Sequence, residues 1–408
     1  MSIEIRTIDE SELARYLTVL GSAFGEPIPE DEVARFKEVL PLDRAFAAFE
    51  RDAMVGTGGA FPFDMTVPGG GTVAAAGVTM IGVLPTHRRR GVMSSIMRKL
   101  IDQARDRSEP VAILWASEES IYQRFGYGLA SNQGHISIEK HKASFLGRPE
   151  PIGTTRLIAL EEAPSVLAPI YDEVRPTRPG MLARSKGWWR HHTLIDIERH
   201  REGESPKFCA VLSIDGRDRA YAIYRTGGGW GADATPNGWV NVREIAAADP
   251  VAYREMWRFV FNIDLADRIK AWYLPADLPL TLMLEEPRRL RFAKSDSLWL
   301  RIVDLPGALQ SRTYAVDGSI SFAVKDDYCP WNDGEWTLVV EDGRGRVQRG
   351  GEPDLATDAA GLAAVFLGAF TFGELERASR LDGCTPGSVR RADAMFHTDV
   401  APWCFENF

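Results

Sequence analysis

Apolar and polar residues succeed one another along the chain in patterns that predict helices and strands in turn. The apolar positions of residues 13–20 follow the i, i+3, i+4, i+7 spacing of an amphipathic helix, and residues 33–40 nearly repeat it. Residues 93–104 carry a longer stripe of the same kind. Strands are predicted where apolar runs lie between turn signals, at residues 45–50, 54–67, 72–84 and 111–116.

A second and a third block follow a polar stretch with proline and glycine at residues 140–155, which we interpret as a linker. The second block predicts helices at 160–174 and 250–262 and strands at 208–214, 220–225 and 239–246. Residues 288–292 and 298–303 lead into the last block, with strands at 319–324 and 335–340 and helices at 359–367 and 372–380. We therefore expect α/β or α+β domains at 1–150, 151–292 and 293–408.

Composition narrows the class of protein. The 408 residues carry a net charge of −9, which excludes broad contact with nucleic acid or anionic lipid and suits a cationic partner. None of the four cysteines forms a CxxC pair, and the first residues lack a signal-peptide pattern. The apolar run at 359–373 is too short to span a membrane, and His191, His192 and His200 lack partners at metal-ligand spacing. We expect a cytoplasmic protein with no membrane span and no metal.

The strongest chemical signal runs from Ile81 to Ser94 and reads IGVLPTHRRRGVMS. A strand ends, Pro85 turns the chain, three arginines and Gly91 follow, and a helix starts at once. A helix N-terminus exposes N–H groups that bind anions, glycine lets a ligand approach closely, and arginines add charge. Pro85 also ends strand pairing at a point where strands can splay around a ligand. A phosphate site is one interpretation, and a solvated basic corner is the other.

This string resembles the acetyl-CoA-binding motif of the GNAT superfamily of N-acetyltransferases, although Met93 stands where the motif has its second glycine. The longer string from Val83 to Gly91 is similar to the enhanced intracellular survival (Eis) family. The strings Ala116–Glu118 and Ile121–Gly128 agree with that family, as does the aromatic C-terminus. The resemblance implies tandem GNAT-like domains, of which the second is degenerate, followed by a sterol-carrier-like α+β domain.

The resemblance also implies a binding site for acetyl-CoA as co-substrate. In the superfamily, backbone N–H groups of the motif hold the phosphates, and an amide at the splayed strand end, here that of Val83, faces the thioester oxygen. Tyr122 and Gln123 would flank the pantetheine arm or the acetyl group. The implied cofactor-binding residues are Ile81, Gly82, Val83, Arg88, Arg89, Arg90, Gly91, Val92, Met93, Ser94, Tyr122 and Gln123.

Tyr127 is the candidate general acid. An amine that attacks a thioester must lose a proton, and the leaving thiolate should gain one. Thiols titrate near about 8.5 and tyrosine near about 10, so a positioned phenol can donate to the departing sulfur. The glycines on either side of Tyr127 allow a bend that aims the phenol inward. The alternative is a core tyrosine with a satisfied hydroxyl.

The base that the resemblance implies is the terminal carboxylate of Phe408. The tail is unusually aromatic, with Trp403, Phe405 and Phe408 among its last six residues, and such an end gains by burying itself. The alternative is a tail that packs on a nearby patch. Glu118 and Glu119 are rival bases by position.

The acceptor is expected to be a small cationic amine, because family members acetylate aminoglycosides and some acetylate lysine; a polyamine is a third possibility. Acidic and aromatic side chains would hold such a cation by charge and ring quadrupole.

Because no cysteine lies near the motif, we expect direct attack in a ternary complex. The family also implies a homohexamer. A CoA- or lipid-binding regulatory or scaffold protein without turnover is the alternative function. The candidate acceptor-binding residues are Phe24, Glu26, Phe36, Met80 and Glu406.

Overall fold

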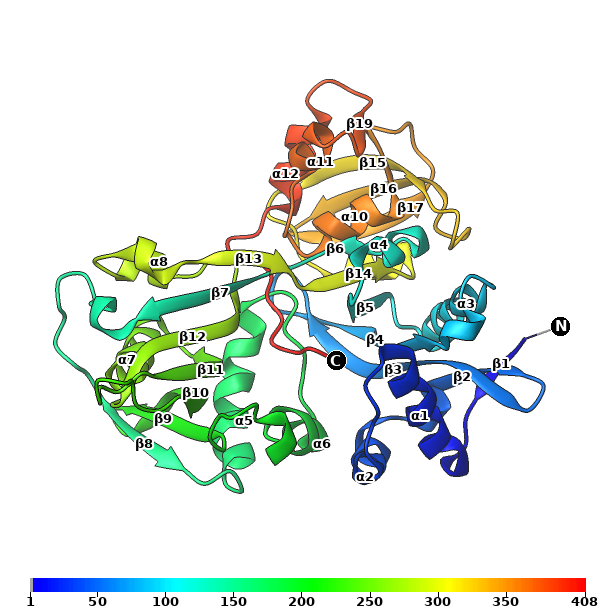
Figure 1. Ribbon diagram of the computed structural model, residues 1–408. Coiled ribbons are helices and arrows are strands. Elements are labelled where there is room, and N and C mark those ends of the chain that lie inside the picture. The colour runs from blue at the N-terminus through cyan, green and yellow to red at the C-terminus, as the bar shows by residue number, and fades with distance from the viewer. Residues whose placement is uncertain (1–2) are drawn as a thin grey trace. The chain divides into compact units, whose positions relative to one another are not determined.

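Three β-sheets organise residues 3–408, the part of the chain that this computed structural model describes (Figure 1). Residues up to 131 form one unit with residues 297–399 and 406–408, which we name unit 1. Residues 132–296 and 400–405 form the other, unit 2. The blocks expected at 1–150, 151–292 and 293–408 are continuous along the chain, whereas two of the three sheets draw strands from more than one of them.

Sheet 1, in unit 1, is mixed. Its order is β1 (Glu4–Thr7), β2 (Ala45–Glu50), β3 (Ala53–Thr66), β4 (Thr72–Val83), β5 (Val111–Trp115), β14 (Leu298–Ile302) and β6 (Gly128–Leu129). The helices that follow these strands are α1 (Leu13–Phe24), α2 (Glu30–Val39), α3 (Val92–Asp106) and α4 (Glu119–Tyr122). The apolar stripe of α3 is fully buried on one face of this sheet, as its spacing predicts.

Sheet 2, in unit 2, repeats this plan. Its order is β13 (Ala293–Asp296), β7 (Asn132–Glu139), β12 (Ala266–Pro275), β11 (Gly238–Ala247), β10 (Arg217–Gly227), β9 (Phe208–Ile214) and β8 (Thr154–Ile158). Its helices are α5 (Ala163–Val174), α6 (Lys186–Trp188), α7 (Pro250–Asn262) and α8 (Leu280–Met283). The two halves thus exchange a strand: β7 follows β6 of sheet 1 but pairs in sheet 2, and β14 follows β13 of sheet 2 but pairs in sheet 1.

Sheet 3 lies in the C-terminal part of unit 1. Its order is β17 (Arg344–Arg349), β16 (Gly334–Glu341), β15 (Gly318–Lys325), β18 (Leu355–Asp358) and β19 (Leu381–Gly383), with helices α9 (Leu305–Ser311), α10 (Ala359–Phe366), α11 (Phe372–Arg377) and α12 (Ser388–Phe396). The apolar run at 359–373 begins as α10, which is buried along its whole length and packs on β14 and β6. Among residues 3–408 no helix combines the length and the apolar content that crossing a membrane requires.

Most elements predicted from periodicity are confirmed within a few residues, including α1, α3, α7, α10 and strands β2 to β5. The patterns missed strands with mixed polarity, such as β7 and β12, of which β7 runs up to the expected linker at residue 140. Local sequence carries little signal for these strands, because their stability depends on partners far along the chain.

Candidate active site

Strand β4 separates from its neighbour β5 well before it ends. The parallel pairing of β4 with β5 covers only Ala75 to Gly77, although β4 continues to Val83. On its other edge, β4 stays paired with β3 but contains a bulge, because the register shifts between Thr57 and Gly59. Met80 lies in this bulge with a positive φ of 55°, and its carbonyl accepts a hydrogen bond from Thr57 Oγ1 at 2.9 Å. A gap between strands therefore opens beyond Gly77.

The end of β4 leaves polar backbone groups facing this gap. Leu84 N donates to Val55 O of β3 at 3.0 Å, so Leu84 faces β3. Successive strand residues point their N–H and C=O groups to opposite edges, so those of Val83 point toward the gap. Arg88 Nε donates to Val83 O from that side at 3.3 Å.

The helix that follows begins without a side-chain cap. Gly91, at the N-cap of α3, has a φ of 79° and no side chain to accept from the first helical N–H groups. A Cβ built on Gly91 would meet nothing within 4 Å, so the space before the helix is open. The uncapped end therefore presents free N–H donors and the positive end of the helix dipole to an anion.

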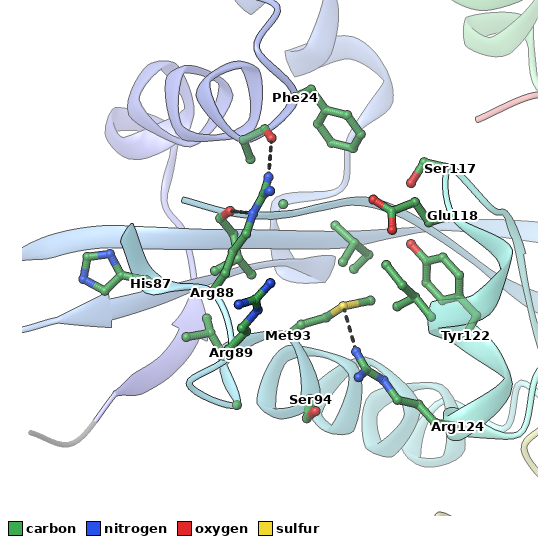
Figure 2. Close-up of a pocket in the computed structure, with 17 residues that line it drawn as sticks. Phe24, His87, Arg88, Arg89, Met93, Ser94, Ser117, Glu118, Tyr122 and Arg124 are labelled. Carbon is green, nitrogen blue, oxygen red and sulfur yellow. Dashed lines mark hydrogen bonds between the residues drawn. The ribbon is translucent and has the colours of Figure 1, made fainter. Parts of the chain in front are cut away.

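The separated edge of β4 and the uncapped start of α3 both open into one cavity of about 760 Å³ (Figure 2). Figure 2 shows His87, Arg88 and Arg89 on one side of it and Ser117, Glu118 and Tyr122 on the other. The predicted site residues that line it are Phe24, Ile81, Gly82, Val83, Arg88, Arg89, Gly91, Val92, Met93, Ser94 and Tyr122. Sequence reasoning did not assign Ala23, His87, Ser117, Ile121 and Arg124 to this cavity, and gave Glu118 only as a rival base.

Four arginines lie in or near the cavity, and the surroundings of their guanidinium groups differ. Arg88 Nη2 donates to Ala23 O at 2.9 Å and thereby ties α1 to the end of β4. Arg90 does not line the cavity, because its guanidinium pairs with Glu50. Arg89 lines the cavity, is exposed, and makes no ion pair with the side chains that the structure describes. Arg124 reaches the cavity from the far side, where Nη2 lies 3.7 Å from Met93 Sδ.

Tyr127 lies next to the cavity but does not line it. The ring is fully buried and stands edge-on to that of Tyr122, with ring centres 6.1 Å apart. Its hydroxyl has no hydrogen-bond partner among the described residues. Burial raises the pKa of Tyr127 far above its usual value, and the positive charge of Arg301 opposes that rise. Gln123 is exposed and also lies outside the cavity lining.

The aromatic tail is anchored in two places. Within unit 2, Trp403 N donates to Pro179 O at 2.8 Å and Trp403 Nε1 donates to Tyr273 O at 2.7 Å. Within unit 1, the Phe408 ring packs against Phe63, with ring centres 4.9 Å apart. A Cβ on Gly77 would lie 3.1 Å from the Phe408 ring, so Phe408 sits where β4 and β5 begin to separate.

Phe408 and Tyr127 lie on opposite faces of sheet 1. Tyr127 belongs to the cluster beneath α3, which includes Val78 of β4. Phe408 packs on the adjacent β4 residue, Gly77, and adjacent strand residues point to opposite faces. The gap beyond Gly77 is thus flanked by Tyr127 on one face and by the chain end on the other.

The candidate acceptor residues are dispersed. Phe24 is 53% exposed and lines the cavity, whereas Glu26, which is exposed, does not. The face of the half-buried Phe36 ring carries the guanidinium of Arg35, 4.4 Å from the ring centre. Met80 and Glu406 lie outside the cavity lining, and Glu406 is buried.

Cys329 lies in the same buried cluster as Tyr127, which the sequence did not indicate. Burial raises the pKa of its thiol, so it stays protonated, and it does not line the cavity. Among the side chains that the structure describes, no three His, Cys, Asp or Glu residues gather as a metal site requires.

Unit 2 starts the corresponding helix differently. Asp249 caps α7, where its carboxylate accepts from Ala252 N at 2.8 Å and pairs with Arg219 at 3.1 Å. A carboxylate thus occupies the place in which α3 has an open end, and it would repel a second anion.

Comparisons with known proteins agree with this architecture. Residues 4–130 and 180–302 match two different families that are both described as acetyltransferase (GNAT) domain, and residues 305–405 match the sterol carrier protein domain. An uncharacterized N-acetyltransferase of Streptomyces coelicolor is 37% identical over 100% of both chains. N-acetyltransferase Eis of Mycobacterium tuberculosis is 29% identical over 98% of both. The crystal structure of Eis1 from Mycobacterium abscessus superposes with a TM-score of 0.87 at 33% identity, covering 99% of this chain and 100% of that one.

Proposed function

The chain belongs to the Eis family of GNAT N-acetyltransferases, and we propose that it transfers acetyl from acetyl-CoA directly to a primary amine of a small cationic substrate. The observation that carries this proposal is the single cavity that joins the uncapped start of α3 to the separated edge of β4. Attack within a ternary complex is favoured over a covalent intermediate, because none of the described residues that line the cavity is a cysteine.

The residues at the start of α3 fit a diphosphate. The open end at Gly91 and the N–H groups of the following turn would hold it, because no side chain of the described residues occupies that space. Met93, in place of the second glycine, lines the cavity without closing it. Arg89 and Arg124 would add charge from two sides. Acetyl-CoA supplies the activated acetyl group when it is bound.

The edge of β4 supports a thioester between the strands. The N–H of Val83 points toward the gap and would donate to the carbonyl oxygen as negative charge develops there. Ile81 and Gly82 would line the pantetheine arm of acetyl-CoA, and Tyr122 would flank the pantetheine arm or the acetyl group.

Proton transfers are assigned to Tyr127 and to the terminal carboxylate of Phe408. The raised pKa keeps the Tyr127 phenol protonated at neutral pH, and its hydroxyl, unpartnered within residues 3–408, is available to donate to the leaving sulfur. The chain end lies on the opposite face of the gap, where a base would accept the proton of the attacking amine. In this arrangement the base would act on the attacking amine and the acid on the leaving sulfur, from opposite sides of the acyl carbon.

We propose acceptors of three kinds: aminoglycoside-like amines, polyamines and lysine side chains. Glu118 on the cavity wall and Phe24 at its edge suit a cation through charge and ring quadrupole, and the net charge of −9 favours approach. We also propose a cytoplasmic homohexamer, and sedimentation velocity would test the oligomeric state.

The decisive experiment is release of CoA thiol from acetyl-CoA with a panel of these amines. We expect turnover with several of them, and Tyr127→Phe should lower kcat by about 100-fold or more while the Kd for CoA is unchanged. Tyr16→Phe is the matched control, because Tyr16 is a fully buried phenol on α1. Equal rates for Tyr127→Phe and wild type would remove Tyr127 from the mechanism, and no turnover with any amine would contradict the proposed substrate class.

A further inference from the structure

Arg301 places a positive charge in the core beside Tyr127, although it comes from a distant part of the chain. It lies on β14, between β5 and β6 of sheet 1, and is 0% exposed. Its Nη2 donates to both carboxylate oxygens of Asp326, at 2.7 and 2.5 Å. Its Nε and Nη1 make no hydrogen bond of good geometry with the described residues, although the guanidinium also interacts with the Cys329 thiol.

The guanidinium lies directly against the backbone that precedes Tyr127. A Cβ built on Gly126 would fall 1.7 Å from Arg301 Nη1, so only glycine leaves room for this arginine. Gly126 also has a φ of 81°, which an L side chain rarely adopts. The charged guanidinium therefore lies close enough to Tyr127 to act on its phenol, and the buried hydroxyl of Tyr127 has no hydrogen-bond partner among the described residues.

Stability alone does not explain this arrangement. A buried ion pair is often no more stable than an apolar replacement, and buried donors without acceptors lower stability further. The groups that act on the Tyr127 phenol are Arg301, Tyr122, Tyr328 and Cys329, and of these only Arg301 favours the phenolate.

We propose that Arg301 is a positioning residue that stabilises the negative charge on Tyr127 during acetyl transfer. In this step the C–S bond of the tetrahedral intermediate breaks, the phenol O–H bond breaks, and its proton forms the S–H bond of CoA. The phenolate that remains is stabilised by the adjacent guanidinium until a proton from solvent restores the phenol. This inference rests on the proposed role of Tyr127 as the acid.

Asp326 fixes Arg301 in place and joins the C-terminal domain to the site. Its carboxylate also accepts from Tyr328 N at 3.2 Å and Cys329 N at 2.8 Å, which holds it at the start of the loop between β15 and β16. The same loop grips α3, because Tyr328 Oη donates to Ser94 O at 3.1 Å and the Arg98 guanidinium lies 3.7 Å from the Tyr328 ring centre. The loop thus contacts both Arg301, which lies beside the proposed acid Tyr127, and α3, at whose start we propose that CoA binds.

A double-mutant cycle on the full-length protein tests the proposal. Arg301→Met is combined with Asp326→Asn so that no buried charge is left unpaired. We expect these two substitutions together to lower kcat at least about tenfold. Loss of the guanidinium should raise the pKa of the Tyr127 phenol further, and each unit changes its proton-transfer equilibrium tenfold. In a Tyr127→Phe background the same pair should cause no further loss. Arg301→Lys, which keeps the charge, should retain most of kcat.

Arg312 provides the matched control. It is an equally buried arginine of unit 1, held by the carbonyls of Phe366 and Phe396, so Arg312→Met should lower the melting temperature without lowering kcat. Should the Met–Asn pair not fold, Arg301→Gln with Asp326→Asn must show the same loss.

An equal loss of kcat in the wild-type and Tyr127→Phe backgrounds, or no loss in either, would overturn the role of Arg301. If Tyr127→Phe alone keeps the wild-type kcat, the assignment of Tyr127 as the acid fails instead.

Discussion

Two arginines that face each other across the cavity should carry most of the side-chain charge that holds CoA. Arg89 is exposed and forms no ion pair with any described side chain, so Arg89→Ala should leave stability unchanged. A phosphate about 4 Å from a guanidinium is stabilised by about 1 kcal/mol in water and by more at a partly enclosed site. Arg89→Ala and Arg124→Ala should each raise the Kd for CoA about 5- to 30-fold, since 1.4 kcal/mol is a factor of ten.

Titration calorimetry with CoA at two salt concentrations measures this effect. The wild-type Kd should rise with salt, and the double variant should show a weaker dependence because fewer charges are screened. Arg90→Ala is the control, because Arg90 is held by Glu50 outside the cavity. Wild-type affinity in the Arg89→Ala/Arg124→Ala double variant, or equal weakening by Arg90→Ala, would refute the assignment of the phosphates to this cavity.

Three further predictions concern the tail, the second unit and pH. Deleting Phe408, or extending the chain beyond it, should lower kcat by about 100-fold or more in the thiol-release assay while CoA still binds; unchanged turnover in both would exclude the chain end as base. Asp249→Ala should lower the free energy of unfolding by about 1 kcal/mol in urea titrations without changing kcat, because the helix it caps lies outside the active site. Burial lowers the pKa of Lys207 to about 8 from 10.5, so this group destabilises the fold when charged and releases that penalty as pH rises from about 8 to 10.5. Over that range the unfolding free energy of wild type, relative to Lys207→Met, should rise by up to about 3 kcal/mol, and a flat difference would contradict the assigned environment.

Short-range signals were sufficient to predict the strand end and the helix start at which we propose that CoA binds. The stripe of α3, the end of β4 and the glycine between them lie within one local string, so the sequence alone places them together. Arg124 was missed because it lies at a short helical turn, where exposed basic residues have no distinctive spacing. The distinction between Arg89, which is free to bind, and Arg90, which Glu50 holds, depends on a partner 40 positions away.

Long-range packing accounts for what the sequence could not reveal around Tyr127. The glycines beside it predicted a bend, and the structure adds a second reason for them. A Cβ on Gly126 would collide with Arg301, and one on Gly128 would lie 2.0 Å from Ala360 O of α10. Both neighbours come from the C-terminal part of the chain. Neither contact can be predicted from the sequence, because it requires knowing that β14 pairs with β5 and β6 in sheet 1.

Units 1 and 2 differ at few residues around the first helix after the separated strand, because the strand arrangement itself is repeated in both. Strand β11 of unit 2 also loses its parallel partner partway, after Val242, and its register with β10 also shifts, between Ile223 and Tyr224. A separated strand and a bulge are therefore properties of the fold that both halves share. The anion site is not shared, because Asp249 stands where the first half has Gly91. We therefore attribute the proposed acetyl-CoA site of the first half less to its sheet than to the glycine with which α3 begins.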